Sequence, residues 1–253
     1  MRRVASVLAL CAALLAAAGA SADIRDEFIR IGESVATKVA VDPADFLYDI
    51  HLASEDRTPL PIDKDWQIGT NIFPGIIPFT EVSLGVKSKV KGEHGGWPQI
   101  DLNAGGWDSI ASSVVGNYVE DFKGNLWGLR AGVSGSVSLD PRLRLFAGYE
   151  FSQMRVDVNI KFKDMNTKTG LELRVLQALS NLHVGKTEHF VFTGAEVLRT
   201  ARKRIVAEVG YGVVHNKLLA RLTWASRSFD TGFAFYPEGA WVLWPIWNFQ
   251  VRF

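Results

Sequence analysis

The sequence predicts an all-β fold: an antiparallel transmembrane up-and-down β-barrel of eight strands, with ten as the alternative, and a short helical N-terminal segment. From residue 79, apolar and polar residues alternate with a period of two through most of the chain, as expected of strands with one apolar face. No apolar run after residue 22 approaches the roughly 20 residues that a membrane helix needs. Such a chain can cross a membrane only as a closed barrel, because nothing else pairs every backbone group in lipid.

Residues 1–22 predict a signal peptide. Two arginines precede an apolar run, and Ala20-Ser21-Ala22 offers a small-residue cleavage site. An N-terminal membrane anchor, the alternative, is disfavoured because the apolar run is short and rich in alanine. The mature chain would then begin at Asp23. It would contain no thiol, disulfide or cysteine metal site, since Cys11 is the one cysteine of the sequence.

The charge balance of the mature chain is close to neutral. Of the 28 Lys and Arg residues of the sequence, Arg2 and Arg3 belong to the signal peptide, which leaves 26 basic against 27 acidic residues. We therefore expect no nucleic-acid partner. The five histidines show no spacing typical of metal ligands, so we also predict no metal site and no cofactor.

Residues 23–60 predict a helical segment, because apolar residues recur there at helical spacing with charged residues between them. A second helix start is indicated at Asp42-Pro43, where Asp42 can cap the helix and Pro43 suits its first turn. The segment can pack against the barrel mouth or lie on a membrane surface as an interfacial helix. Residues 61–78, rich in proline, predict a linker or an edge strand, and residues 79–253 the barrel itself.

Eight strands follow from the alternation. The parity of the apolar face switches near Ser152-Gln153, which predicts a β-bulge. The stretch 171–184 is read as a strand because its neighbours are strands, although its pattern also fits a helix. The expected strands are 79–90, 125–139, 142–162, 171–184, 188–199, 204–215, 217–236 and 241–253. The long loop at 92–123 has room for a further hairpin, which would give ten.

The last thirteen residues, 241–253, carry an apolar side chain at every odd position and include three tryptophans. They resemble the C-terminal strand of bacterial outer-membrane β-barrel proteins, which ends in an aromatic residue preceded by apolar residues at alternate positions. The resemblance implies a location in the outer membrane of a Gram-negative cell envelope, with lipids and lipopolysaccharide as neighbours. It also implies insertion by the outer-membrane assembly machinery, through an assembly signal made of Trp247, Phe249, Val251 and Phe253.

If the last strand ends in the periplasm, the side of every connection follows. The helical segment 23–60 would then also be periplasmic. The expected periplasmic turns are 140–141, 185–187 and 215–217. The expected outer loops are 92–123, 163–170, 200–203 and 237–239.

Charged residues on the inward faces are expected to form a network that plugs the lumen, because buried charges need partners and eight strands leave room only for side chains. Basic residues outnumber acidic ones, which favours a narrow, anion-preferring channel as an alternative. The expected network comprises Glu81, Lys87, Lys89, Arg130, Arg144, Glu150, Arg155, Asp157, Glu172, Arg174, Glu196, Glu208, Arg221, Arg227 and Arg252.

No set of residues strongly predicts a catalytic site. Small outer-membrane barrels that modify lipids use a histidine with a serine and an acid, and His94 is the one histidine expected in an outer loop, near Asp108, Ser109, Ser112 and Ser113. We expect a monomeric, non-enzymatic barrel with a structural or surface-interaction role. The alternatives are a lipid-modifying hydrolase or acyltransferase and the narrow channel.

Overall fold

The computed structural model describes most of the chain from residue 65 onward, together with part of the segment between residues 30 and 48. The described ranges are 65–72, 81–109, 119–163, 165–167, 169–200, 203–235, 237 and 243–252. Ten strands lie within them: β1 (Trp66–Ile72), β2 (Glu81–Lys91), β3 (Gln99–Ser109), β4 (Val119–Asp140), β5 (Leu143–Phe162), β6 (Asn181–Thr200), β7 (Lys203–Gly212), β8 (Lys217–Ala225), β9 (Phe229–Phe235) and β10 (Leu243–Arg252). The short 3-10 helix η2 (Met165–Thr167) and helix α5 (Gly170–Ser180) connect β5 to β6.

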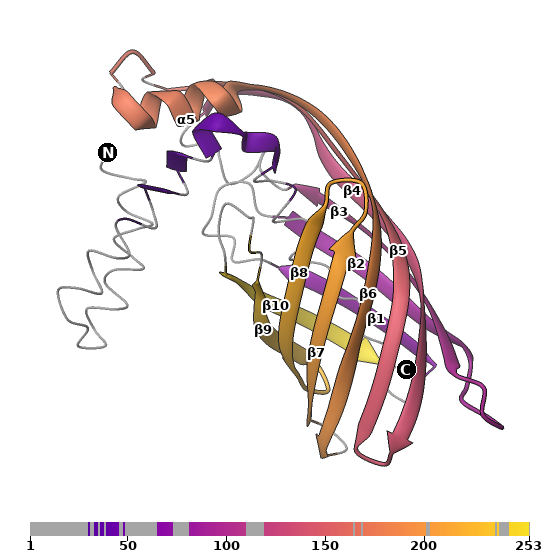
Figure 1. The fold of residues 1–253 in the computed structure, drawn as a ribbon. Coiled ribbons are helices and arrows are strands. Elements are labelled where there is room, and N and C mark those ends of the chain that lie inside the picture. Colours follow the sequence, from indigo (N-terminus) through magenta and orange to yellow (C-terminus); the bar gives the residue numbers. More distant parts are fainter. Residues whose placement is uncertain are drawn as a thin grey trace.

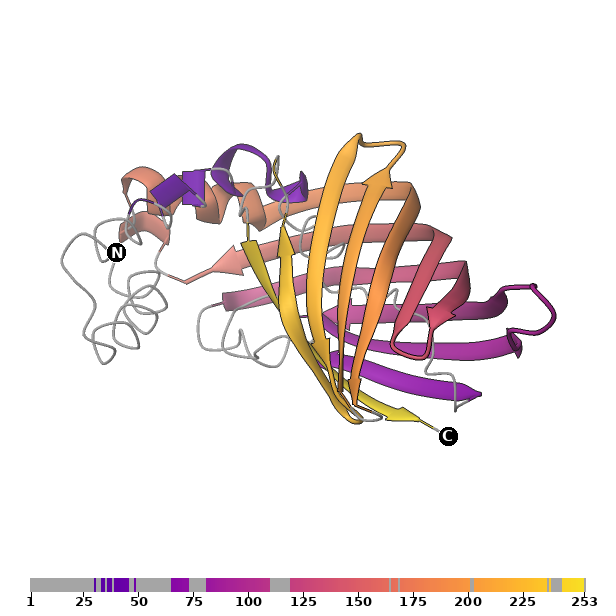
Figure 2. The ribbon, with the colours of Figure 1, turned by 60° about the horizontal axis from the view of Figure 1, so that its bottom comes forward.

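All neighbouring strands pair antiparallel, and β1 pairs with both β2 and β10, which closes the sheet into a barrel (Figures 1 and 2). The all-β expectation is confirmed. The count of eight is wrong, because the described strands number ten.

Four differences produce the new count. Strand β1 lies within residues 61–78, for which a linker or an edge strand was expected, and β3 lies within the long loop where a further hairpin had room. The two strands expected at 171–184 and 188–199 become one strand, β6, preceded by α5. The strand expected at 217–236 is divided into β8 and β9 by a tight turn, in which Ser226 donates its N–H to the carbonyl of Phe229 at 3.0 Å.

Helix α5 corrects the strand expected at 171–184. Its sequence, GLELRVLQALS, is rich in good helix formers. Leu176 and Leu179 lie three residues apart, on one face of the helix, and pack against the hydrophobic core. The expected turn at 185–187 is also wrong, because these residues pair with Gln153 to Arg155 in the middle of the β5–β6 ladder.

The β-bulge expected near Ser152-Gln153 is absent from β5. Exposed and buried positions alternate without a break along the strand, and its pairing with β4 and β6 shows no register shift at this point. The same alternate positions therefore point outward along the whole strand, but the apolar side chains change from the outward to the inward face. From Leu143 to Phe151 the outward face is apolar, and from Gln153 to Lys161 it is polar.

The inward face of β5 shows the opposite exchange. Its first half carries Arg144, Glu150 and Ser152, all buried, whereas its second half is apolar and buried from Met154 to Phe162. We call residues 119–128 of β4, 154–162 of β5 and 181–186 of β6 the extension, and the remainder of the closed sheet the barrel body. The extension reaches beyond β7 and curves toward α5 (Figure 1).

The barrel has two distinct ends. At the C-terminal end, where β10 finishes, lie the connections 92–98, 141–142 and 226–228, and β6 ends and β7 begins there. At the opposite end, the α5 end, lie η2, helix α5 and the turn 213–216, together with the ends of β1, β3 and β9. The turn at 215–217 and the connection at 200–203 thus lie on the sides opposite to those expected, because the turn at 226–228 adds one reversal of the chain.

The described residues between 30 and 48 are helical except Asp42, whose carboxylate accepts the N–H of Asp45 at 2.9 Å. This confirms Asp42 as a helix cap. Tyr48 is fully buried and donates its hydroxyl to Glu188 at the α5 end. Asp65, in contrast, pairs with Lys89 at the C-terminal end. The expectation that the helical segment and the C-terminus share one side is therefore wrong for these residues.

Candidate functional site

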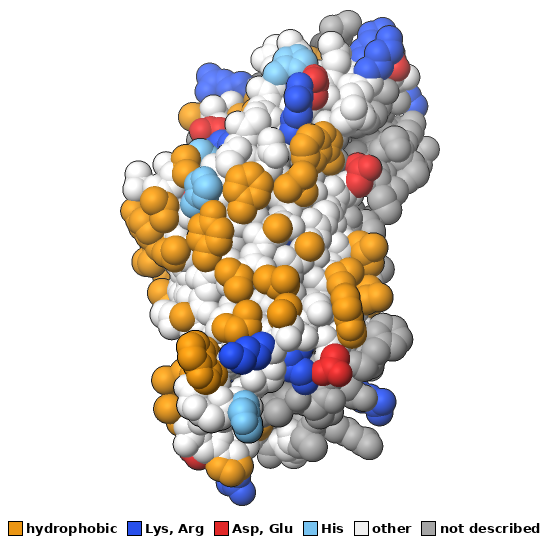
Figure 3. All heavy atoms as spheres, turned by 90° about the vertical axis from the view of Figure 1, so that its right-hand side faces the viewer, with side chains coloured by type: hydrophobic (Ala, Val, Ile, Leu, Met, Phe, Trp, Pro, Cys, Tyr) orange, Lys and Arg blue, Asp and Glu red, His pale blue; other side chains and the backbone are white. Residues whose placement is uncertain are grey.

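The outer wall of the barrel body is apolar. Exposed aliphatic and aromatic side chains lie on its strands, among them Leu145, Val191, Val209, Leu222 and Phe233. Figure 3 shows hydrophobic side chains across the middle of the sheet, with charged side chains and histidines above and below them. We call this apolar zone the belt.

The height of the belt can be compared with the apolar band of outer-membrane barrels. Along β5 it runs from Leu143 to Phe151, about 27 Å at about 3.4 Å per residue, or about 21 Å along the barrel axis for a strand tilted by about 40°. The apolar band of outer-membrane barrels is about 25 Å tall. At its upper edge lie Tyr149 and His189, whose hydroxyl and Nδ1 are 2.6 Å apart. Aromatic residues typically occupy this level of a membrane barrel.

The interior of the barrel body is filled by aromatic rings that lie over inward-facing glycines. A Cβ atom at Gly148 would lie 2.4 Å from the ring of Phe192, and one at Gly194 would lie 2.4 Å from the ring of Phe146. Trp107 occupies the equivalent space over Gly128. The space beside these inward glycines is therefore taken up by side chains.

Charged side chains fill the rest of this interior. Glu196 is the centre of one cluster: its two carboxylate oxygens lie 2.8 Å from Arg204 and 3.6 Å from Arg144, and all three residues are almost fully buried. Asn103 donates to the buried Glu150 at 2.6 Å. Removing one partner of such a buried ion pair is strongly destabilising, because the other charge is left uncompensated.

The structure places the members of the expected network in four groups. Lys87, Arg144, Glu150, Glu196, Glu208 and Arg221 are buried on inward faces, and Lys89 and Arg130 are partly exposed. The side chains of Glu81 and Arg252 lie outside the described residues, as do those of Trp247 and Phe253 in the assembly signal. Of that signal, Phe249 and Val251 are described, and both are exposed.

Five members are misplaced in the expected network. Arg155 and Asp157 lie on the outward face, because the parity of β5 does not switch. Glu172 and Arg174 belong to α5, and Arg227 lies in the exposed turn between β8 and β9. The expected network also lacks five buried charges, for which strand parity was the available signal: Asp101, Glu188, Arg204, Lys217 and Asp230.

The residues around His94, considered as the alternative of a lipid-modifying site, are not brought together. His94 pairs with Trp97 in the connection at the C-terminal end, whereas Asp108 lies near the other end of β3. About ten residues of strand separate the two ends of β3, a distance of roughly 30 Å. Ser112 and Ser113 lie outside the described residues, as does the side chain of Ser109.

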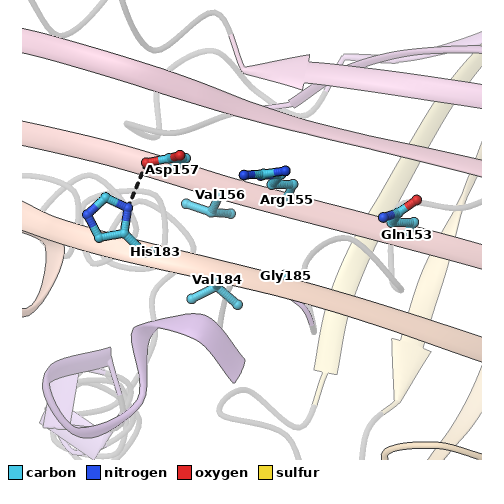
Figure 4. Close-up of a pocket in the computed structure, with 7 residues that line it drawn as sticks. All are labelled: Gln153, Arg155, Val156, Asp157, His183, Val184 and Gly185. Atoms are coloured by element: carbon cyan, nitrogen blue, oxygen red, sulfur yellow. Dashed lines mark hydrogen bonds and ion pairs between the residues drawn. The ribbon is translucent and has the colours of Figure 1, made fainter.

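A different histidine lies beside an acid. His183 on β6 and Asp157 on β5 are cross-strand neighbours, with Nδ1 2.6 Å from the carboxylate. They line an open hollow of about 320 Å³ on the outward side of the extension (Figure 4). The lining residues are Gln153, Arg155, Val156, Asp157, His183, Val184 and Gly185.

A second polar cluster lies at the α5 end and joins the N-terminal helical residues to the barrel. Asp45 accepts from Lys186 and Lys217, both at 2.7 Å. Burial raises the pKa of Asp45, but the two ammonium groups outweigh it and hold the pKa below its ordinary value. Glu188, fully buried, accepts Tyr48 Oη at 2.9 Å and the N–H of Val214 at 2.7 Å. We call these residues the clamp.

Comparison of the sequence with models of known families gives no match, and comparison with characterised proteins gives none. In the described part of the chain, no helix is both long and apolar enough to span a membrane. Within the same part, no three His, Cys, Asp or Glu side chains are placed to share a metal ion. The hollow and the clamp are therefore judged on their own geometry.

Proposed function

We propose that this protein is a monomeric, integral outer-membrane β-barrel with a plugged interior, which carries a water-exposed structural or surface-interaction module at one mouth. The exchange of polarity along β5 carries the proposal. Where the outward face is apolar, the inward face carries the buried polar residues Arg144, Glu150 and Ser152 alongside Phe146, as in a strand surrounded by lipid. Where the outward face becomes polar, the inward face becomes an apolar core, as in a strand surrounded by water.

The module consists of the extension, α5 and the clamped N-terminal helical residues. Its core contains Val156, Val158 and Ile160 of β5, with Leu176 of α5 and Ala44 of the N-terminal segment packed against it. This is the arrangement of a small soluble domain, in which a helix covers one face of a sheet. Its charged outer surface would face solvent and other molecules.

The orientation follows from the connections. Those at the C-terminal end contain seven residues or fewer, and one of them contains only two, whereas the α5 end holds a connection that includes a whole helix. Outer-membrane barrels have short periplasmic turns and longer outer loops. The C-terminal end therefore lies in the periplasm, and the module lies outside the outer leaflet. This replaces the periplasmic location expected for the described N-terminal residues.

The filled interior favours a plug over the narrow anion-preferring channel. The inward Phe146, Phe190 and Phe192 are each at most 5% exposed, and the cluster around Glu196 lies among buried neighbours. A conducting path requires a continuous polar lumen. Planar-bilayer recordings of the purified protein should therefore show no discrete conductance steps.

Single-cysteine labelling tests both membrane insertion and orientation, because the mature chain contains no cysteine of its own. We expect Lys161→Cys, in the extension, to react with a membrane-impermeant maleimide in intact cells. Arg142→Cys, at the C-terminal end, should react only after the outer membrane is permeabilised. Leu145→Cys, in the belt, should stay unlabelled in both conditions. Labelling of Arg142→Cys alone in intact cells would reverse the orientation, and labelling of Leu145→Cys would contradict insertion.

The assembly signal remains a prediction of the resemblance. Deletion of Phe253 should reduce the amount of folded protein in the outer membrane. Heat-modifiable migration in gel electrophoresis measures the folded fraction. An unchanged folded fraction would contradict the assignment.

A lipid-modifying hydrolase is the second candidate, favoured by the pair of Asp157 and His183, since a carboxylate that orients a histidine is typical of a general base. None of the seven lining residues carries a hydroxyl or a thiol, so water would have to be the nucleophile. Release of fatty acid from lipopolysaccharide or phospholipid, lost in His183→Gln, would support this function. Absence of release by the folded protein supports the non-enzymatic barrel.

A further inference from the structure

The hollow on the extension lies directly above the belt. The strand register sets the order of the outward rows on β5 and β6: Tyr149 beside Val191, Phe151 beside His189, Gln153 beside Thr187 and Arg155 beside Gly185. The first two rows belong to the aromatic edge of the belt. The hollow begins one row higher, which in a membrane is the level of the lipid headgroups.

Arg155 is the cation of the hollow. Its side chain is exposed, and among the described residues no carboxylate or other acceptor pairs with its guanidinium. Its neighbour across the β4–β5 ladder is Trp127, an aromatic side chain of the kind that is enriched where lipid meets water. An unpaired guanidinium at this level is a preformed ligand for a phosphate group, which it can bind through two parallel N–H donors.

His183 supplies a second donor on the same surface. Its Nδ1 faces Asp157, which leaves Nε2 on the far side of the ring (Figure 4). When the imidazole carries both of its protons, Nε2 is an N–H donor that faces away from Asp157. His183 is the diagonal neighbour of Arg155 in the ladder, at a separation of about 7 to 8 Å. A phosphate group can bridge donors at that separation, with one oxygen directed to each.

Gly185 keeps the hollow open. It lies directly opposite Arg155 in the ladder, and a Cβ atom at this position would have no neighbour within 4 Å. Its backbone also does not require glycine, since its φ angle is not positive. A larger side chain at position 185 would therefore occupy the hollow without disturbing the strand.

From these four observations we propose that the hollow binds the phosphate of an anionic lipid headgroup in the adjacent leaflet, with Arg155 and His183 as donors and Asp157 as the residue that positions His183. The ligand chemistry is that of a phosphate ester, which a free phosphate ion shares in part. The location favours the lipid, because the acyl chains of a bound lipid would lie along the belt immediately below. The proposal rests on the membrane insertion proposed above.

Native mass spectrometry of the full-length protein, folded and purified in detergent, tests the site. Equal concentrations of phosphatidylglycerol and phosphatidylcholine are offered together, and the fraction of protein that carries one lipid of each kind is measured. We expect phosphatidylglycerol to be retained preferentially. Arg155→Gln should weaken this retention about tenfold, the loss of one charge-assisted contact, and Gly185→Leu should abolish the preference. Arg142→Gln, an exposed arginine at the opposite end, is the matched control and should leave the preference unchanged.

The outcomes separate the two proposals. Loss of heat-modifiable folding or of vesicle insertion in the wild type would overturn the membrane barrel. Normal insertion with equal retention by wild type, Arg155→Gln and Gly185→Leu would overturn the headgroup site alone. Displacement of phosphatidylglycerol by equimolar inorganic phosphate would show a free-anion site and overturn the lipid assignment. Asp157→Asn gives a further readout: it should weaken retention less than Arg155→Gln does, because Asp157 acts only by positioning His183.

Discussion

The barrel body and the extension are built from the same strands but are inverted with respect to each other. In the body, Leu145 faces outward and Arg144 inward, whereas in the extension Lys161 faces outward and Ile160 inward. The backbone register is continuous between them. Alternation of apolar and polar residues therefore shows only which residues share a face of a strand. Which face carries the apolar side chains depends on whether lipid or water surrounds that part of the sheet.

The largest effect is expected inside the barrel body. Glu196→Ala leaves Arg144 and Arg204 without their carboxylate in a buried interior, and the free energy of unfolding should fall by about 3 to 5 kcal/mol. Urea titration of the protein in vesicles measures this loss. Glu120→Ala, which removes the partner of the exposed Lys161 in the extension, should cost about 1 kcal/mol or less. Equal losses would remove the distinction between the buried ion pairs of the barrel body and the exposed ion pair of the extension.

On the outer wall, an added charge should be destabilising in the barrel body and tolerated in the extension. Val209 is 51% exposed in the belt, and Val209→Arg should cost about 2 to 4 kcal/mol if the residue lies near the bilayer midplane. Asn159→Arg, on the polar outward face of the extension, should change the free energy of unfolding by less than about 0.5 kcal/mol. The same urea titrations compare the two variants. A tolerated arginine at position 209 would mean that this wall faces water.

The core of the extension should respond as the core of a soluble protein does. Ile160 is 2% exposed and belongs to the apolar cluster, so Ile160→Val should cost about 0.5 to 1.5 kcal/mol. Amide hydrogen exchange should show the loss in the extension and α5 while protection in β7 and β8 stays unchanged. Faster exchange throughout the barrel would indicate that the extension does not open separately from the body.

The smallest effect concerns the clamp and depends on pH. Because the pKa of Asp45 is lowered in the folded state, its ion pairs stabilise the fold at pH values above 3.8, the ordinary pKa, and this contribution is lost as the pH falls through the lowered value. The contribution should be about 1 kcal/mol or less, since Asp45 is partly exposed. In urea titrations, the free energy of unfolding should differ between wild type and Asp45→Asn at pH 6, and this difference should be smaller at pH 3. An equal difference at both pH values would contradict the ionic role.

The all-β class and several strand limits could be predicted from the sequence, because a period of two is a local property. Strand β7 was expected at 204–215 and is observed at Lys203–Gly212. The bulge at Ser152-Gln153 was predicted wrongly, because a change of parity and a change of surroundings leave the same trace in the sequence. Helix α5 was assigned to a strand because its flanking strands outweighed its own helical pattern, although leucine, glutamate and alanine favour a helix.

The candidate site was beyond sequence reasoning for a related reason. Arg155 and Asp157 were assigned to the lumen, so the pairing of Asp157 with His183 across two strands could not be foreseen. That pairing depends on the register of β5 and β6, which long-range contacts determine. The buried Glu188, in contrast, has the same parity as Glu196 on one strand, and this signal could have identified it.

The exchange of polarity along β5 is tested most directly by spin labels on its outward face. Single cysteines at Leu145, Ala147, Tyr149, Asp157 and Lys161, each labelled in vesicles, report collisions with oxygen, which concentrates in lipid, and with a water-soluble nickel complex. We predict that oxygen dominates at positions 145 to 149 and that the nickel complex dominates at 157 and 161, although all five side chains lie on one face. Nickel accessibility at all five positions, or oxygen accessibility at all five, would contradict the inverted pair of regions.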